Sequence, residues 1–431
     1  MKRNYYQLYA VLLATSICLN YKAFSQHNSA KPFPDRIILN IAEDASTSIA
    51  VTWRTDLSTS EGYCELQSLT PSPINPMNTQ YFKAKTSRIK YVYKEEPAIE
   101  ANQHSYVFAN LEPGEKYLYR VGKEDLWSEW LEFKMPSREK SKFSFIYFGD
   151  PQSNIKSEWS RVIRKAYSFS PNSSFMLYGG DVINRAGRDL EWEEWFVAGS
   201  YIYGMIPQVL TPGNHDYIDQ QVDPHWKYQF TQPSNGPEEV KNTCFFSDFK
   251  NLKIISIDSA TENELSNENG SALKSQKAWL DSLLTVNTKD WVIITTHLPF
   301  YSSKETRDNP ILRKHFQPIL EKHGVDMVLT GHDHSYGRGM ASDFTSEPSV
   351  VYIVSVSGPK LSETSDKEWM QVKGSNIQLF QEISIVGNNL HYKAFTADGK
   401  LFDEFKIKKN NDRKSEFVEL NKKVNLFQMM E

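Results

Sequence analysis

Residues 325–334 read VDMVLTGHDH, an apolar run that ends in a glycine and then two histidines, His332 and His334. A short apolar run bounded by a turn residue is typical of a buried strand. Two imidazoles one residue apart can share a metal site, because imidazole is a common ligand of divalent metals. The stretch therefore predicts a buried strand that delivers metal ligands at its carboxyl end.

Four other apolar runs lead into similar polar clusters: FSFIYFGD, SSFMLYGGD, MIPQVLTPGNHD and WVIITTH. In chain order they supply Asp150, Asp181, the triplet Asn214, His215 and Asp216, and His297. Ligands of α/β proteins bind at the carboxyl ends of the parallel strands. Each cluster alone is also explained by a turn or a buried histidine. Five in succession predict carboxylate, amide and imidazole groups that hold two divalent cations side by side.

The composition narrows the class of protein. A chain of 431 residues favours two or three domains, and 39% hydrophobic residues suffice for their cores. The net charge of −4 and the lack of a long basic run predict no nucleic-acid binding.

The N-terminus predicts export. Residues 1–25 have the pattern of a signal peptide, with Lys2 and Arg3, an apolar stretch over 8–19, and small residues before Gln26. The apolar stretch is too short for a transmembrane helix, so the mature chain is expected to have none. The alternatives are an uncleaved anchor and a lipoprotein attached through Cys18.

Two domains are expected in the mature chain, joined by a short charged and polar linker. Residues 33–136 show alternating strands, and the run Leu111, Pro113-Gly114 and Tyr117 resembles fibronectin type III domains, in which a corner tyrosine hydrogen-bonds back to the chain. Residues 142–408 alternate strands with helical patterns, which predicts an α/β domain, and residues 409–431 form a charged tail left unassigned. A modest, polar interface is expected between the domains. Cys64 and Cys244 are interpreted as two separate buried thiols rather than a bridge between domains.

The order of the motifs resembles the calcineurin-like metallophosphoesterase superfamily, and with the β-domain it resembles the purple acid phosphatases. His297-Leu298-Pro299-Phe300-Tyr301 is similar to the HxPxY segment of that family, and residues 331–338, GHDHSYGR, to its GHxHxYxR segment. The resemblance implies a β-sandwich followed by a four-layer α/β/β/α phosphoesterase domain.

The resemblance also implies roles for the residues of the motifs. Asp150 and His334 would bind a first metal, Asn214, His297 and His332 a second, and Asp181 would bridge both. The metals would be manganese, zinc or iron, and His215 would face the substrate phosphate. Asp216 has two interpretations, orienting His215 or capping the turn. Tyr301, Tyr336 and Arg338 either line the pocket or support it.

Two positions depart from the family pattern. Purple acid phosphatases have a tyrosine three residues after the bridging aspartate, where this chain has Asn184. Other members of the superfamily have a histidine two residues after the first aspartate, where this chain has Gln152. Both amides are candidate weak ligands of the first metal.

These observations predict an exported hydrolase of phosphate monoesters that acts on a small phosphorylated substrate through a metal-bridging hydroxide. One alternative is a phosphodiesterase acting on nucleotide, lipid or glycan phosphates, since the same ligands serve both reactions. The other is a surface binding protein whose metal site has decayed.

Overall fold

The computed structural model describes residues 29–94, 98–137, 142–260, 270–340, 350–410 and 415–421. The predicted signal peptide, residues 1–25, lies outside the described residues. In the described part of the chain, no helix combines the length and the apolar character needed to cross a membrane.

The N-terminal domain is a sandwich of two sheets. One sheet contains β3 (Tyr63–Ser68), β4 (Gln80–Lys83), β7 (Lys116–Lys123), β8 (Leu126–Trp127) and β9 (Leu131–Lys134). The other contains β1 (Asp35–Ile41), β2 (Ile49–Thr55), β5 (Lys85–Tyr91) and β6 (Ile99–Phe108). Alternate side chains of both sheets, among them Trp53, Leu66 and Tyr119, form the core between them. The Tyr117 hydroxyl accepts a hydrogen bond of 2.8 Å from the backbone N–H of Glu112, which is the predicted corner contact.

The second domain is built on two further sheets. In the first, β10 (Phe143–Phe148), β11 (Met176–Tyr178) and β12 (Gln208–Leu210) are parallel, and β22 (Leu379–Val386), β23 (Asn389–Thr396), β24 (Leu401–Lys409) and β25 (Ser415–Glu419) extend it antiparallel. The second contains β15 (Phe245–Phe249), β16 (Leu252–Ile257), β17 (Trp291–Thr296), β18 (Met327–Thr330), β20 (Val351–Val354), β19 (Tyr336–Met340) and β21 (Val372–Gly374). Strands β16, β17, β18 and β20 are parallel. A short hairpin joins β13 (Tyr217–Ile218) and β14 (Gln221–Val222).

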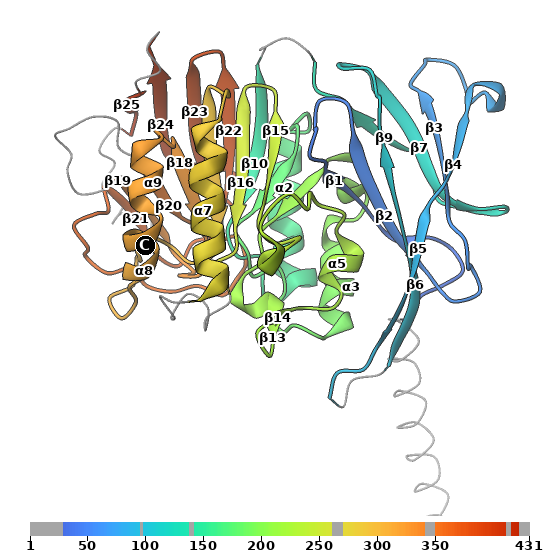
Figure 1. Ribbon diagram of the computed structural model, residues 1–431, viewed down its shortest axis with the longest axis horizontal. Helices are drawn as coiled ribbons and strands as arrows, with labels where there is room; N and C mark the ends of the chain where they lie inside the picture. The colour runs from blue at the N-terminus through green and yellow to red at the C-terminus, as the bar shows by residue number, and fades with distance from the viewer. Residues whose placement is uncertain are drawn as a thin grey trace, which may run out of the picture.

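Helices cover the outer faces of these two sheets, and Figure 1 shows α7 and α9 lying in front of the strands. Residues such as Phe145, Ile293 and Leu329 pack between the sheets. Helices α2 (Ser160–Phe169), α3 (Asp189–Gly199), α4 (Tyr201–Met205) and α5 (Trp226–Gln229) pack on the first sheet. Helices α7 (Ser271–Thr285), α8 (Pro310–His315) and α9 (Gln317–Lys322) pack on the second. The predicted four-layer α/β/β/α order is therefore confirmed. Four further short helical segments span Pro76–Asn78, Ile155–Trp159, Asn214–Asp216 and Glu238–Val240.

The two domains share one sheet. Strand β1 pairs in parallel with β12, so the N-terminal strands continue the first sheet of the second domain to eleven strands. The side-chain amide of Asn40 donates to the Gln208 carbonyl at 3.0 Å, and the Tyr119 hydroxyl donates to the Gly204 carbonyl at 2.6 Å. The interface is polar, as expected, and it is also continuous with the sheet, because backbone pairing and buried hydrogen bonds join the domains.

The tail contains a strand that the sequence prediction missed. Ser415–Glu419 pairs with β24 along its length, and Phe417 stacks on Phe405 with their ring centres 5.2 Å apart. Residues 409–431 had no assignment from the sequence, and the structure corrects this for Ser415–Glu419, which is a strand. The prediction of two separate thiols is confirmed, since Cys64 and Cys244 are both buried and free.

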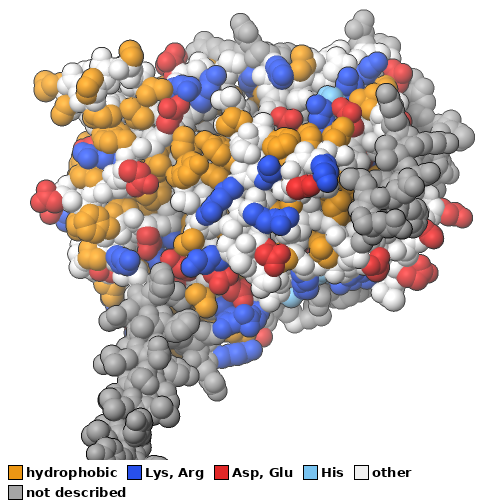
Figure 2. All heavy atoms as spheres, turned by 180° about the vertical axis from the view of Figure 1, so that it is seen from behind, with side chains coloured by type: hydrophobic (Ala, Val, Ile, Leu, Met, Phe, Trp, Pro, Cys, Tyr) orange, Lys and Arg blue, Asp and Glu red, His pale blue; other side chains and the backbone are white. Residues whose placement is uncertain are grey.

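Figure 2 shows the face opposite to that of Figure 1. Hydrophobic side chains gather over the N-terminal domain, while lysines and arginines are spread among acidic side chains. The exposed hydrophobic residues of this domain include Met77, Tyr81 and Val107.

Candidate metal centre

Five strand ends bring the predicted ligands together. Asp150, Asp181 and Asn214 follow β10, β11 and β12 of the first sheet. His297 follows β17 of the second sheet, and His332 and His334 follow β18. Because the strands of each sheet are parallel here, their carboxyl ends lie at one edge, and the two packed sheets place those edges face to face. The fold thus converts five separate sequence motifs into one cluster.

Asp150, Asp181 and His334 form a first group of potential ligands. One ligand atom from each lies within 4.8 Å of the others, and all three residues are buried. The His334 Nε2 atom is 3.1 Å from Oδ2 of Asp150. Two carboxylates and an imidazole are a suitable donor set for a transition-metal cation.

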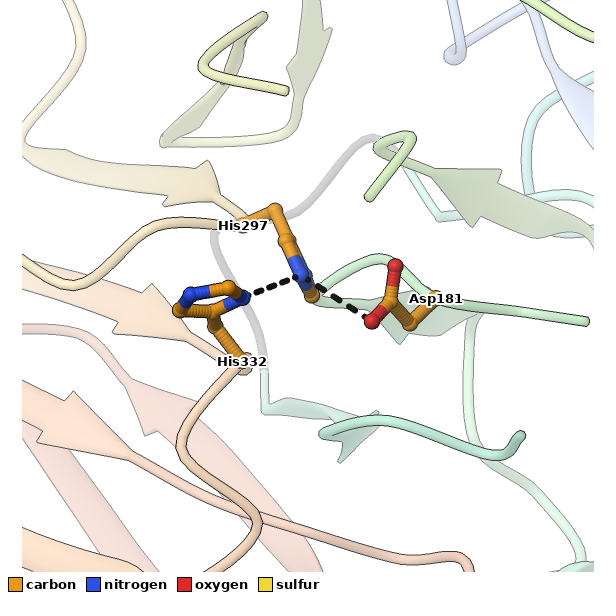
Figure 3. Close-up of side chains that lie close together, drawn as sticks. All are labelled: Asp181, His297 and His332. Carbon is orange, nitrogen blue, oxygen red and sulfur yellow. Dashed lines mark hydrogen bonds and ion pairs between the residues drawn. The ribbon is translucent and has the colours of Figure 1, made fainter. Parts of the chain in front are cut away.

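Asp181, His297 and His332 form a second group within the same limit of 4.8 Å. Figure 3 shows the His297 ring between the other two side chains, with its Nε2 atom 3.3 Å from Asp181 Oδ2 and 3.2 Å from His332 Nδ1. The Oδ1 atom of Asn214 joins them, 3.1 Å from His297 Nε2 and 2.9 Å from His332 Nδ1. Asp181 belongs to both groups, so the donor chemistry fits two cations that share one carboxylate.

Backbone groups fix the orientation of these ligands. His297 Nδ1 lies 2.8 Å from the Gly179 carbonyl, which can only accept, so this nitrogen carries the proton and Nε2 is free to bind a metal. The backbone N–H of His332 donates to Asp150 at 2.8 Å, and that of His215 donates to Asp181 Oδ1 at 2.7 Å. The ligands are therefore held in place by the protein itself.

The charges of the cluster also favour cations. Burial alone would raise the pKa of Asp181, but His297 and the backbone N–H of His215 hold it below its usual value. Burial would lower the pKa of His297, yet Asp181 and Asp150 raise it to about 9. The buried carboxylates thus keep their negative charge, and this charge favours the binding of metal cations.

The backbone is strained where it presents the ligands. Asp181, His332 and His334 have φ angles of 49°, 72° and 57°, a left-handed region that non-glycine residues seldom adopt. Glycine is required beside them, since a Cβ atom on Gly213 would lie 2.2 Å from Asp181 Oδ1 and one on Gly331 would lie 1.9 Å from Asp150 Oδ1. The glycines of the GNH and GHDH motifs therefore allow the close approach of the carboxylates.

His215 and Asp216 have separate surroundings. His215 Nδ1 donates to the Asn184 carbonyl at 2.6 Å, which leaves Nε2 on the other side of the ring. The carboxylate of Asp216 accepts from the backbone N–H groups of Gly213, Val182 and Ile183. Burial and the nearby charge of Asp181 raise the pKa of Asp216 well above its usual value. Asp216 therefore ties two loops together, which supports the interpretation that it caps the turn, and no described hydrogen bond joins its carboxylate to the His215 ring.

The two amides that depart from the family pattern do not present oxygen to the first group. Gln152 turns its side-chain nitrogen to the cluster, 2.7 Å from Asp181 Oδ2 and 3.1 Å from His334 Nε2. The Asn184 side-chain oxygen accepts from the Ser153 hydroxyl at 3.1 Å. The hypothesis that these oxygens act as weak ligands is therefore not supported by the geometry.

Lys360 is a site residue that the sequence prediction missed. Its Nζ atom lies 3.1 Å from Gln152 Oε1 and 3.1 Å from His215 Nε2. Because an ammonium group has donors only, the Gln152 oxygen must face it and the Gln152 nitrogen must face the carboxylates. A signal was present, since residues 350–360, VVYIVSVSGPK, are another apolar run that leads into a glycine turn.

Tyr301, Tyr336 and Arg338 support the site from a distance. The Tyr301 hydroxyl donates to Gln317 at 2.9 Å, and Tyr336 and Arg338 are buried with hydrogen bonds to Asp403 of 2.5 Å and 2.7 Å. Arg338 also pairs with Glu419 of β25 at 2.7 Å. Of the two interpretations, support fits these contacts, and the assignment to substrate binding is not supported.

Two family models match the chain. Residues 143–336 match the calcineurin-like phosphoesterase family, and residues 34–135 match the N-terminal domain of purple acid phosphatases. The chain therefore contains a purple acid phosphatase N-terminal domain followed by a calcineurin-like metallophosphoesterase domain.

Curated relatives and solved structures agree with this assignment. Purple acid phosphatase 18 of Arabidopsis thaliana is 22% identical over 73% of this chain and 68% of its own length. Probable inactive purple acid phosphatase 9 of the same plant is 25% identical over 54% of this chain and 42% of its own length. The chain thus spans roughly half the length of several curated relatives that it matches. A purple acid phosphatase from yellow lupin (Lupinus luteus) seeds has the same fold, with a TM-score of 0.74, 17% identity, and coverage of 88% of this chain and 75% of its own.

Proposed function

We propose that this protein is a dinuclear-metal phosphoesterase that hydrolyses phosphate monoesters. The observation that carries the proposal is the sharing of Asp181 by two adjacent groups of potential ligands. A carboxylate between two cations about 3.5–4 Å apart offsets their repulsion, and this arrangement is common in phosphatases. The membership of the second domain in the calcineurin-like phosphoesterase family supports the same reaction class.

In this proposal, Asp150 and His334 hold the first cation, Asn214, His297 and His332 hold the second, and Asp181 bridges them. When bound, such ions lower the pKa of a water molecule and withdraw charge from phosphoryl oxygens. His215 lies beside both groups without belonging to either, and its Nε2 faces the ammonium of Lys360. We therefore assign His215 to the substrate, where it contacts the phosphoryl group or the leaving oxygen.

A binding protein with a decayed metal site is the second candidate. It is favoured by the Gln152 side-chain nitrogen, which occupies a position beside Asp150, Asp181 and His334 where relatives would offer a ligand. One curated relative is itself named a probable inactive phosphatase. The retention of both ligand groups favours the enzyme over this candidate.

The two candidates are separated by an assay of the purified protein with manganese, zinc or ferrous iron. We expect hydrolysis of p-nitrophenyl phosphate that a chelator abolishes and that returns when the metal is restored. Absence of hydrolysis with every metal, over a panel of monoesters and diesters, would support the binding protein.

We also propose that the protein is exported through residues 1–25. The support is the basic start, the apolar stretch and the small residues before Gln26. Amino-terminal sequencing of protein recovered outside the cytoplasm is expected to begin at Gln26. An intact Met1 on the exported protein, or retention in the cytoplasm, would contradict the proposal.

A further inference from the structure

Lys360 places a positive charge beside the candidate metal centre. It follows β20, the strand next to β18 in the second sheet, so it reaches the same edge as the ligands. The segment before it runs along Asp150, where Val356 forms a parallel bridge and the Gly358 N–H donates to the Asp150 carbonyl at 2.6 Å. The loop that carries Lys360 is thus fixed to the backbone of a predicted ligand.

The contacts of Lys360 leave it able to bind an anion. It uses two of its three N–H groups on Gln152 and His215, both at 3.1 Å. Within the described residues, the third has no partner. The side chain is half-buried, so solvent and substrate can reach it. Neither of its two partners carries a negative charge that would neutralise it.

The number of terminal oxygens distinguishes the two classes of phosphate ester. A monoester has three terminal oxygens and nearly two negative charges at neutral pH. A diester has two terminal oxygens and one charge, because its third oxygen carries an alkyl or aryl group. Two cations can each take one terminal oxygen, and a separate cationic donor is then matched only by the third oxygen of a monoester.

Resting on the proposed function, we propose that Lys360 is a specificity-determining residue that binds the third terminal oxygen of a phosphomonoester and so selects monoesters over diesters. The loss of a hydrogen bond between two charged groups weakens binding by about tenfold to a hundredfold. Only binding of the monoester should weaken in this way, because only the monoester has a third terminal oxygen left to contact the ammonium.

The test compares p-nitrophenyl phosphate with methyl p-nitrophenyl phosphate, which have the same leaving group. Wild-type protein is expected to prefer the monoester in kcat/KM. Lys360→Met should lower this preference by about tenfold or more, with the metal content unchanged. Lys360→Arg keeps the charge and should retain a larger part of the preference.

Lys304→Met is the matched control. Lys304 shares the electrostatic environment of Lys360. Burial and the charges of Arg307 and Lys360 lower the pKa of Lys304, whereas the charges of Asp333 and Asp150 raise it. It has no described hydrogen bond to His215 or Gln152. Removing it should change the preference by less than about threefold, as expected for a screened charge effect.

Binding provides a readout independent of turnover. Calorimetry with inorganic phosphate should show a dissociation constant about tenfold higher for Lys360→Met, whereas that for dimethyl phosphate should change little. Equal losses for monoester and diester, or unchanged binding of phosphate, would overturn the role of Lys360 while leaving the phosphoesterase intact. Wild-type protein that hydrolyses neither ester would overturn both.

Discussion

His215 is held at one ring nitrogen and offers the other to the candidate site. The Asn184 carbonyl fixes Nδ1, so rotation of the ring away from the cluster would break a hydrogen bond of 2.6 Å. Nε2 then faces the region between the ligand groups and Lys360. This placement suits a group that assists the reaction without holding a metal.

We predict that His215→Ala keeps its metals and loses activity. When Lys360 contacts the substrate instead of Nε2, this nitrogen can take up a proton, and proton donation by a positioned side chain contributes ~10²–10⁴-fold, most for poor leaving groups. The rate on an alkyl phosphate should therefore fall more than the rate on dinitrophenyl phosphate. Metal analysis and the two rates check this, and a fall in metal content would show that His215 is a ligand.

For single residues, the sequence predicted which side chains cluster but not what surrounds them. Asp181 and His334 were found because their residue types and their positions after apolar runs restrict the possible chemistry. The orientation of Gln152 was missed, since it depends on Lys360, which lies 208 residues further along the chain. The role of Asp216 was undecided for the same reason, because two of the N–H groups that it binds, those of Val182 and Ile183, lie in another loop.

Strand β6 carries a buried histidine in the core of the sandwich. His104 stacks on Trp53 with ring centres 5.2 Å apart, and its two nitrogens lie 2.8 Å and 2.9 Å from the hydroxyls of Thr55 and Thr86. Burial lowers the pKa of His104 to about 4. The ring is therefore neutral in the folded domain over most of the pH range.

We predict that His104 makes the sandwich less stable in acid. In the unfolded chain the ring takes up a proton near pH 6.5, but in the folded domain only near pH 4. Stability is therefore full above pH 6.5 and falls as the pH drops towards 4, by up to about 3 kcal/mol. Thermal unfolding of wild type and His104→Gln from pH 7 to 4.5 checks this. The variant should lose less stability on acidification, and parallel curves would contradict the assignment.

At the element scale, regular strands and hairpins were predictable because their period and turn residues are local. Strands β15 and β16 form such a local hairpin, and Gly387 and Gly399 turn the chain with positive φ angles. Strand β25 was missed, because its five residues are mostly polar and are held by neighbours distant in sequence. Phe417 and Glu419 meet Phe405 and Arg338, which no local pattern reveals.

The domains of the whole molecule are joined by buried charges as well as by backbone pairing. Asp189 of α3 accepts from Arg36 at 2.6 Å and from Arg54 at 3.4 Å, and the side chains of both arginines are at most 3% exposed. His225 lies 3.4 Å from the same carboxylate. The N-terminal domain thus supplies two buried arginines, and the second domain supplies a carboxylate that pairs with both.

We predict that Asp189→Asn destabilises the protein by about 3–5 kcal/mol, because it leaves the buried Arg36 without its closest carboxylate partner and takes a second one from Arg54, which keeps Asp35. Glu193→Gln is the control, since Glu193 meets the same arginines at 3.3 Å and 3.6 Å but its side chain is 23% exposed. The control should cost about 1 kcal/mol or less. Thermal unfolding compares the two variants, and equal small losses would contradict a structural role for the buried cluster.

At the scale of the whole molecule, the sequence predicted the two domains and their order but not their connection. The pairing of β1 with β12 joins Asn40 to Gln208, and such distant pairing is decided by tertiary contacts rather than by local propensity. The buried ion pairs could not be predicted from local sequence either, because Arg36 and Asp189 belong to different domains.

Metal content shows whether two cations share Asp181. Purified wild-type protein, loaded with manganese or zinc and then dialysed, is expected to hold two metal ions per chain by mass spectrometry. Asp181→Asn removes the shared charge and should hold one or none, with activity lower by about a hundredfold or more. One ion or none in the wild-type protein, or two ions in Asp181→Asn, would show that Asp181 does not bridge two cations.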